Sequence, residues 1–164
     1  HVAGQLRRHG LPPEALALEI TESALMKNRA LAMKTLENLS AAGVHLAIDD
    51  FGTGYSSLAY LQSVPARVVK IDQSFVRDLD TDRHKRALVS TVIKLSHDLG
   101  RRVVAEGVET AAVATLLLAE GCDQAQGYLY ARPMAPEDFE RWICAKWTLP
   151  RERKAVPPPV LACA

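Results

Sequence analysis

The sequence predicts an α/β fold, part of a (β/α)8 TIM-like barrel, from two observations. Short apolar runs rich in β-branched residues alternate with helical patterns along most of the 164 residues, which is typical of parallel strands covered by helices. Each apolar run also carries a polar residue near its C-terminal end, and the strand ends of a barrel converge on one mouth where active sites are built. A doubly wound sheet would instead concentrate its site at one switch point. Since a complete barrel has eight units and about 250 residues, we expect an incomplete barrel of about five βα units.

The first half of the chain is predicted to alternate strands with helices after the end of an earlier helix at residues 1–10. Short apolar runs bounded by turn or polar residues predict strands at residues 16–20, 44–50 and 66–72. Helical periodicity predicts the helices between them at residues 28–43 and 56–63.

The second half continues the same pattern. Helical segments at residues 83–100 and 109–121 each end at a glycine, a residue that commonly terminates a helix. Strands are predicted after these helices at residues 101–107 and 122–130, and a last helix at residues 136–147.

The composition is that of an ordinary globular domain, with 48% hydrophobic and 24% charged residues. A net charge of +1 gives no field that favours a DNA or RNA polymer or an acidic membrane surface. No apolar run reaches the eighteen or so residues that span a bilayer, and the N-terminus shows no signal peptide, so we expect a cytoplasmic location. The three cysteines lack metal-ligand spacing and receive no role. The tail at residues 148–164 is rich in proline and expected to be disordered, which leaves a domain at residues 1–147.

Four carboxylates stand near the ends of successive predicted strands: Glu19, Asp49, Asp50 and Glu106. Adjacent carboxylates repel unless a cation or a proton lies between them, so the Asp49–Asp50 pair is costly without a function. Aspartates ahead of Gly52 are also common in turns and caps, and for the pair alone that explanation is favoured. Four carboxylates on strand ends favour a metal site instead, and an all-oxygen set suits Mg²⁺ or Mn²⁺ rather than zinc.

Five short motifs occur on successive predicted strands, and together they are specific. They are LEITES, DDFGTGYSSLAYL, KIDQSFV, VVAEGVET and QGYLYARPM, at residues 18–23, 49–61, 70–76, 103–110 and 126–134. In order and spacing they closely resemble the C-terminal portion of EAL domains, the bacterial phosphodiesterases that hydrolyse cyclic di-GMP. The resemblance covers roughly residues 2–147. It implies that the strands bearing the namesake Glu-Ala-Leu motif and a metal-binding Asn lie before His1. The same three letters at Glu14 are in the wrong place, where a turn and strand entry are expected.

The resemblance implies a two-metal site built from the four carboxylates. Glu19 would bind one Mg²⁺ or Mn²⁺ ion, Asp49 would bridge both ions, and Asp50 and Glu106 would bind the other. Two cations would cancel the repulsion within the aspartate pair and lower the pKa of a shared water. This set would thus form both the metal centre and part of the catalytic machinery.

The resemblance also assigns three residues around the metals, each with a simpler alternative. Lys70 would orient the attacking water or stabilise charge on the phosphate, where a solvated or salt-bridged lysine is the default. Gln126 would bind substrate through hydrogen bonds, or would be an ordinary polar residue at a strand end. Glu22 would anchor the loop Gly52–Gly54 behind the metal site, or would only complement a helix N-terminus.

Three functions from different classes stay open. The first is a metal-dependent phosphodiesterase that converts cyclic di-GMP to linear pGpG, inactive as this isolated chain because two ligands are missing. The second is a non-catalytic cyclic di-GMP receptor, and the third is a structural or interaction domain. The resemblance further implies a homodimer through residues Gly52–Leu61, with sensor or GGDEF domains upstream that could anchor the parent protein to a membrane.

Overall fold

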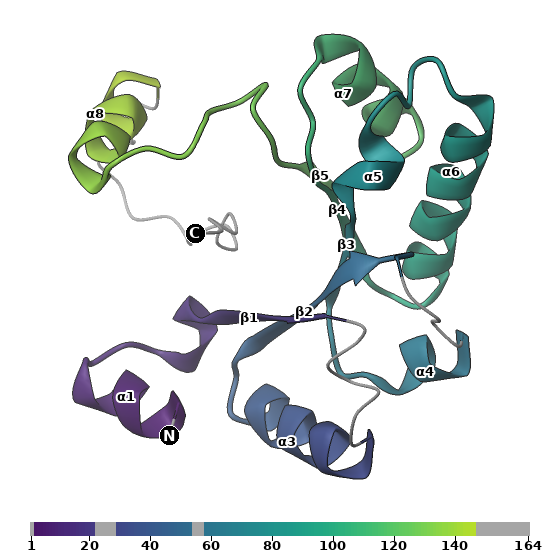
Figure 1. The fold of residues 1–164 in the computed structure, drawn as a ribbon. Helices are drawn as coiled ribbons and strands as arrows, with labels where there is room; N and C mark the ends of the chain where they lie inside the picture. Colours follow the sequence, from purple (N-terminus) through teal and green to yellow (C-terminus); the bar gives the residue numbers. More distant parts are fainter. Residues whose placement is uncertain (1, 22–28, 54–57, 147–164) are drawn as a thin grey trace. The chain divides into compact units, whose positions relative to one another are not determined.

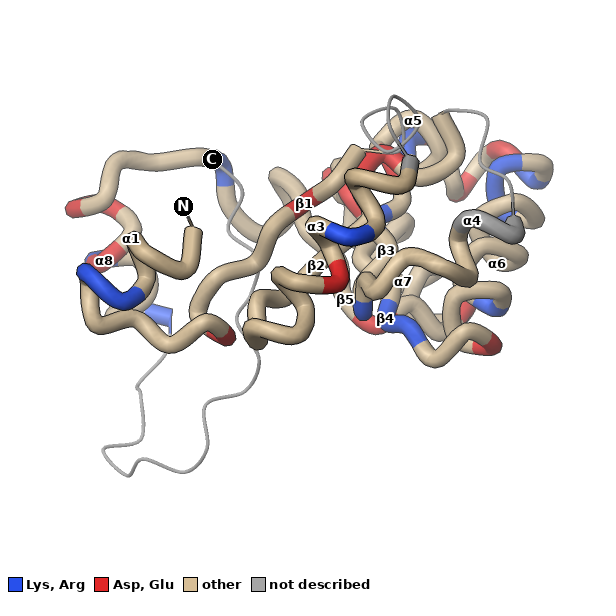
Figure 2. Tube along the Cα trace, turned by 90° about the horizontal axis from the view of Figure 1, so that it is seen from below, with Lys and Arg blue, Asp and Glu red and all other residues tan. Residues whose placement is uncertain are grey.

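A computed structural model describes residues 2–21, 29–53 and 58–146 of the chain (Figure 1). The chain divides into two compact units, the first running from His1 to Tyr130 and the second from Ala131 to Ala164. Positions of both charge signs are interspersed along the trace (Figure 2), in keeping with the net charge of +1. Within the described ranges, no helix combines the length and hydrophobicity that a bilayer crossing requires.

The first unit is built around one parallel sheet whose strands follow each other in sequence order. The strands are β1 (Ala17–Thr21), β2 (His45–Phe51), β3 (Val68–Ile71), β4 (Arg102–Ala105) and β5 (Gln124–Ala125). A sequential parallel order with helices between the strands is the arrangement of a barrel segment, so the predicted fold class is confirmed. Among the described residues the sheet is open, with β1 and β5 at its edges.

The helices of the first unit mostly lie where the periodicity predicts them. They are α1 (Val2–Arg8), α3 (Arg29–Ala41), α4 (Leu58–Ser63), α5 (Gln73–Val76), α6 (Arg83–Asp98) and α7 (Ala111–Ala119), with a short 3-10 turn at Pro13–Ala15. Glu14 lies in that turn ahead of β1, as expected for the coincidental motif. Asp82 caps α6 through the amides of His84 and Lys85, and Gly100 ends it with a positive φ of 70°.

Three details of the predicted elements are wrong. The last strand is not residues 122–130 but only Gln124–Ala125, because Tyr130 N donates back to Gly127 O and the chain turns. Glu19 does not end its strand, since β1 continues to Thr21. The single turn α5 was not predicted, because four residues are too few to show a helical period.

The hydrophobic core lies between the sheet and the helices on one of its faces (Figure 1). Alternate strand residues, such as Leu46, Val69 and Val103, point to this helix-covered face and are at most 2% exposed. Each buried aliphatic side chain of this kind contributes roughly 1.5–3 kcal/mol to folding. The intervening residues, Lys70 among them, therefore point to the opposite face, which we call the inner face.

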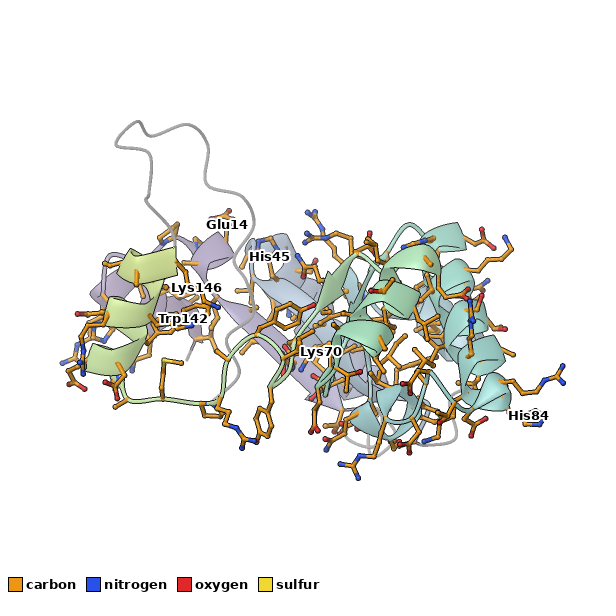
Figure 3. All side chains as sticks on the ribbon, turned by 90° about the horizontal axis from the view of Figure 1, so that it is seen from above. Glu14, His45, Lys70, His84, Trp142 and Lys146 are labelled. Atoms are coloured by element: carbon orange, nitrogen blue, oxygen red, sulfur yellow. The ribbon has the colours of Figure 1, made fainter. Side chains whose placement is uncertain are left out.

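The described part of the second unit is α8 (Pro136–Lys146) and the segment before it. Phe139 and Trp142 stack with ring centroids 6.2 Å apart, and the ammonium of Lys146 lies 5.3 Å from the Trp142 ring (Figure 3). These contacts are local to the helix.

Candidate metal and phosphate site

The centre of the site is Lys70 on β3 (Figure 3). Its side chain lies among three carboxylates. Its Nζ is 2.7 Å from Glu19 Oε2, 3.0 Å from Asp49 Oδ1 and 2.6 Å from Glu106 Oε1, and the side chain is only 2% exposed. The solvated alternative for Lys70 is therefore excluded. Burial disfavours the ammonium, yet the contacts with Glu106, Glu19 and Asp49 outweigh it and raise the pKa of Lys70 above its ordinary value.

The register of the sheet places Glu19 and Lys70 on the same face. Glu19 pairs with Ala47 and Ala47 pairs with Val68, so all three point to the same face. Lys70 lies two residues beyond Val68 and therefore points to that face as well. Glu19 reaches Lys70 from the middle of β1, across β2, which carries a small alanine at the paired position.

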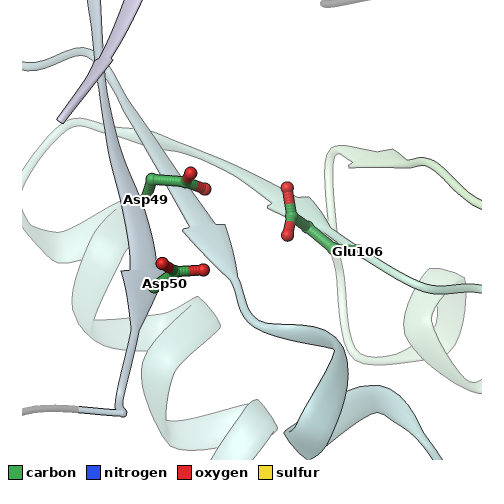
Figure 4. A group of neighbouring side chains, drawn as sticks. All are labelled: Asp49, Asp50 and Glu106. Carbon is green, nitrogen blue, oxygen red and sulfur yellow. The ribbon is translucent and has the colours of Figure 1, made fainter. Parts of the chain in front are cut away.

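A bulge in β2 explains how two adjacent aspartates serve one site. Ile48 pairs with Val69 and Phe51 pairs with Ile71, so Asp49 and Asp50 together face the single residue Lys70. Ile48 and Phe51 both remain in the helix-facing core although they are three positions apart. Asp50 takes a positive φ of 53°, a conformation that aspartate tolerates better than most residues. Both carboxylates consequently point towards Glu106 (Figure 4), which a regular strand would forbid.

The turn after the aspartate pair uses the backbone of Asp50 and not the aspartate side chains. Thr53 donates from its amide and its hydroxyl to the carbonyl oxygen of Asp50, at 3.2 and 2.9 Å. The side chains of Asp49 and Asp50 are left for the site.

The carboxylates of Asp49, Asp50 and Glu106 suit a divalent cation. Each offers one oxygen, and these oxygens all lie within 4.8 Å of one another. Ligand distances of about 2.1 Å for Mg²⁺ and up to about 2.6 Å for Ca²⁺ allow ligand oxygens roughly 4–5 Å apart on opposite sides of an ion. Asp49 Oδ1 is also buried, and its described contact is with the Lys70 ammonium at 3.0 Å. An acceptor of this kind favours a cation.

Two of the three carboxyl groups, Asp50 and Glu106, have pKa values above the ordinary range. Burial, followed by the charges of Asp49 and Asp72, raises the pKa of Asp50. Burial also raises the pKa of Glu106, although Lys70 opposes the change. Both carboxylates thus hold a proton more readily than an exposed carboxyl group, which is expected where negative charges gather away from water.

The remaining predicted site residues differ in how they relate to this cluster. Gln126 follows β5, and its Nε2 donates to Glu106 Oε1 at 2.9 Å, so it belongs to the cluster. Glu22 and residues 54–57 lie outside the described residues. Glu19 touches the cluster through Lys70, although it is not one of the three mutually close carboxylates.

The turn α5 supports the site from behind, a role that the sequence analysis missed. Its cap Asp72 accepts from Ser74 N at 2.9 Å and also contributes to the negative potential at Asp50. A Cβ on Gly52, after Asp50, would lie 2.8 Å from the Phe75 ring, and a Cβ on Gly107, after Glu106, would lie 2.5 Å from Gln73 Cβ. One helical turn therefore packs against both loops that leave the carboxylates. An aspartate two residues before a serine is the capping signal that was available for α5.

Comparison with known proteins shows which family the chain resembles. The protein-family model for the EAL domain matches residues 1–133. MucR of Pseudomonas aeruginosa, a bifunctional diguanylate cyclase/cyclic di-GMP phosphodiesterase, is 47% identical over 138 residues, which are 84% of this chain and 20% of MucR. The chain spans only about a fifth of the length of such curated relatives, from 17% to 23%.

Solved structures give the same result for the fold. The EAL domain of DcpA from Mycobacterium smegmatis matches with a TM-score of 0.82 at 42% identity, over 88% of this chain and 65% of that one. The manganese and cyclic di-GMP complex of BlrP1 from Klebsiella pneumoniae matches with a TM-score of 0.75 at 39% identity, over 80% of this chain and 34% of that one. With the family model covering more than half of its residues, the chain belongs to the EAL domain family.

Proposed function

We propose that this chain is part of a phosphodiesterase that uses two Mg²⁺ or Mn²⁺ ions to hydrolyse cyclic di-GMP to linear pGpG. The observation that carries the proposal is the inner-face cluster, in which three carboxylates converge within 4.8 Å beside the buried ammonium of Lys70. The name of MucR as a cyclic di-GMP phosphodiesterase and the manganese and cyclic di-GMP complex of BlrP1 support it.

The carboxylates would hold the ions, with Glu19 on one, Asp49 shared, and Asp50 and Glu106 on the other. Bound divalent ions supply a water of lowered pKa and positive charge beside the phosphate. The sheet positions these ligands rigidly, because each lies on a strand or directly at its end, and α5 packs against the loops behind them.

Lys70 and Gln126 would act on the substrate side of the cluster. The Lys70 ammonium keeps its proton, since its raised pKa lies far from neutrality, and would stabilise the negative charge that develops on the phosphate during attack. The Gln126 amide remains neutral and is fixed by its hydrogen bond to Glu106. We assign it to orient the phosphodiester or the guanine through its remaining hydrogen-bonding capacity.

Several features of the parent protein are part of the same proposal. Glu22 would anchor the loop Gly52–Gly54, and residues Gly52–Leu61 would form a homodimer contact. The domain would cover residues 1–147, and the predicted tail at 148–164 lies outside the described residues. The parent would be a cytoplasmic protein that carries sensor or GGDEF domains upstream. The name of MucR, which includes a diguanylate cyclase, supports the last point. The 164-residue chain alone would lack activity, because the strands that carry two further metal ligands would lie outside it.

The test is a hydrolysis assay on the full-length protein. Cyclic di-GMP is incubated with Mg²⁺ or Mn²⁺, and nucleotides are separated by chromatography. We expect pGpG to form, the reaction to stop with a chelator, and Asp49→Asn to lose both activity and divalent-ion binding. Asp98→Asn is the matched control, because Asp98 lies exposed on α6 and pairs only with the nearby Lys94 among the contacts described.

A receptor would behave differently in this assay. Tight binding of cyclic di-GMP by the unmutated protein without any pGpG in either metal would replace the enzyme with a receptor. If the protein neither binds nor hydrolyses cyclic di-GMP, the result would favour the structural or interaction domain.

A further inference from the structure

Lys70 uses the same carboxylates that form the candidate cation site. Of the three carboxylates with which Lys70 forms described ion pairs, Asp49 and Glu106 belong to the group whose oxygens lie within 4.8 Å of one another. The third, Glu19, contacts Lys70 but is not one of the three mutually close carboxylates. The described structure therefore shows these carboxylates compensated by an ammonium.

An ammonium and a divalent cation would compete on these carboxylates. A ligand oxygen lies about 2.1 Å from Mg²⁺, and Lys70 Nζ lies 2.6 Å from Glu106 Oε1 and 3.0 Å from Asp49 Oδ1. If a cation bound one of the oxygens that Lys70 contacts and Lys70 kept that contact, the two positive centres would lie at most about 5 Å apart. The Lys70 side chain is 2% exposed, so little water is present to screen that repulsion.

We infer that Lys70 is an internal competitor of the metal: it holds the carboxylates together without a cation, and it gives up its contacts with Asp49 and Glu106 when a cation binds. The inference rests on the proposed metal site and adds a property to it, namely that Lys70 lowers the affinity of that site.

Lys70 weakens cation binding without abolishing it. Glu19, Asp49, Asp50 and Glu106 outnumber the single ammonium, so the cluster keeps an excess of negative charge and still attracts a cation. The ammonium holds the carboxylates in place when no cation is bound, because without it the three mutually close carboxylates would repel one another.

Removing the charge should thus have opposite effects on stability and on affinity. Lys70→Met keeps a long side chain in the buried position and removes the charge. Without divalent ions we expect a lower melting temperature than in the unmutated protein. With Mn²⁺ we expect binding that is tighter by at least about tenfold, and a larger rise of the melting temperature on addition of the metal.

The experiment is a calorimetric titration of the full-length protein with Mn²⁺, with no nucleotide present, together with thermal melts. Lys94→Met is the matched control, because the Lys94 side chain is 78% exposed on α6 and pairs only with Asp98 among its described contacts. Lys70→Gln repeats the test with a neutral side chain that still donates hydrogen bonds, in case Lys70→Met does not fold.

The outcomes separate this inference from the proposed function. Tighter Mn²⁺ binding in Lys70→Met or Lys70→Gln, and unchanged binding in Lys94→Met, would support the competition even in a protein that hydrolyses nothing. Equal or weaker binding in the Lys70 variants would overturn it even in a protein that hydrolyses cyclic di-GMP. Absence of Mn²⁺ binding in all variants would overturn it as well.

Discussion

Replacing Gly127 with alanine tests how tightly the chain after Gln126 is held against the segment after Glu106. Gly127 has a φ of 154°, and a Cβ at this position would lie 2.3 Å from both the amide nitrogen and the carbonyl oxygen of Val108. Both clashing atoms are backbone, so no side-chain rotation relieves them. The two segments have to separate.

The structure gives the size of the effect. Separation breaks the hydrogen bonds from Val108 N to Gln126 O and from Leu129 N to Val108 O, both 3.0 Å long. Val108 is fully buried, so its amide and carbonyl would lose their partners away from water. An unsatisfied buried polar group costs about 1–3 kcal/mol, so the loss of both Val108 partners in Gly127→Ala should lower the free energy of unfolding by about 2–6 kcal/mol. The hydrogen bond between Gln126 and Glu106 would be displaced with it.

Urea unfolding followed by circular dichroism measures this loss as a shift in midpoint at constant slope. Two glycines at which an added Cβ would meet no atom within 4 Å serve as controls. Gly121→Ala meets only the strain of its φ of 84°, about 1–2 kcal/mol. Gly4→Ala lies in α1 and should stabilise by up to about 1 kcal/mol. A loss for Gly127→Ala no greater than that for Gly121→Ala would refute the backbone-clash argument.

Three further predictions concern the site and its support. Lys70→Ala should lower turnover at least about a hundredfold with little loss of substrate binding, because the Lys70 charge acts mainly in the transition state. Steady-state kinetics measures the turnover and nucleotide titration measures the binding. A loss of binding in proportion to the loss of turnover would contradict this prediction. Asp50→Gly should stabilise the protein by about 1 kcal/mol without divalent ions, since it relieves a positive φ of 53° and a crowded charge; a lower unfolding midpoint would show that the carboxylate is stabilising. Arg101→Ala should cost about 2 kcal/mol and speed amide exchange in α4, because the buried Arg101 guanidinium donates to the carbonyls of Leu61 and Val64 at the end of that helix. Exchange as slow as in the unmutated protein would contradict the last prediction.

The sequence alone predicted the elements that are long enough to show a repeating pattern of apolar residues. The sixteen-residue helix α6 is an example, because its apolar residues recur at helical spacing and decide which face points to the core. The strand predicted at residues 122–130 shrank to two residues because its end depends on contacts with Val108, which lies far from it in sequence. The turn α5 escaped prediction because it is too short to show a period.

For the site, the sequence determined which side chains stand at the strand ends, and hence that Asp49, Lys70, Glu106 and Gln126 would meet. Strand alternation requires this once the strands are parallel and in order. Only the tertiary structure decided how they meet. The bulge that turns both Asp49 and Asp50 to one face is a mismatch between two strands, which neither strand encodes by itself. The burial of Lys70 among three carboxylates likewise depends on how β1, β2 and the end of β4 are placed relative to β3. Burial, and not residue type alone, determines how strongly the ammonium and the carboxylates interact.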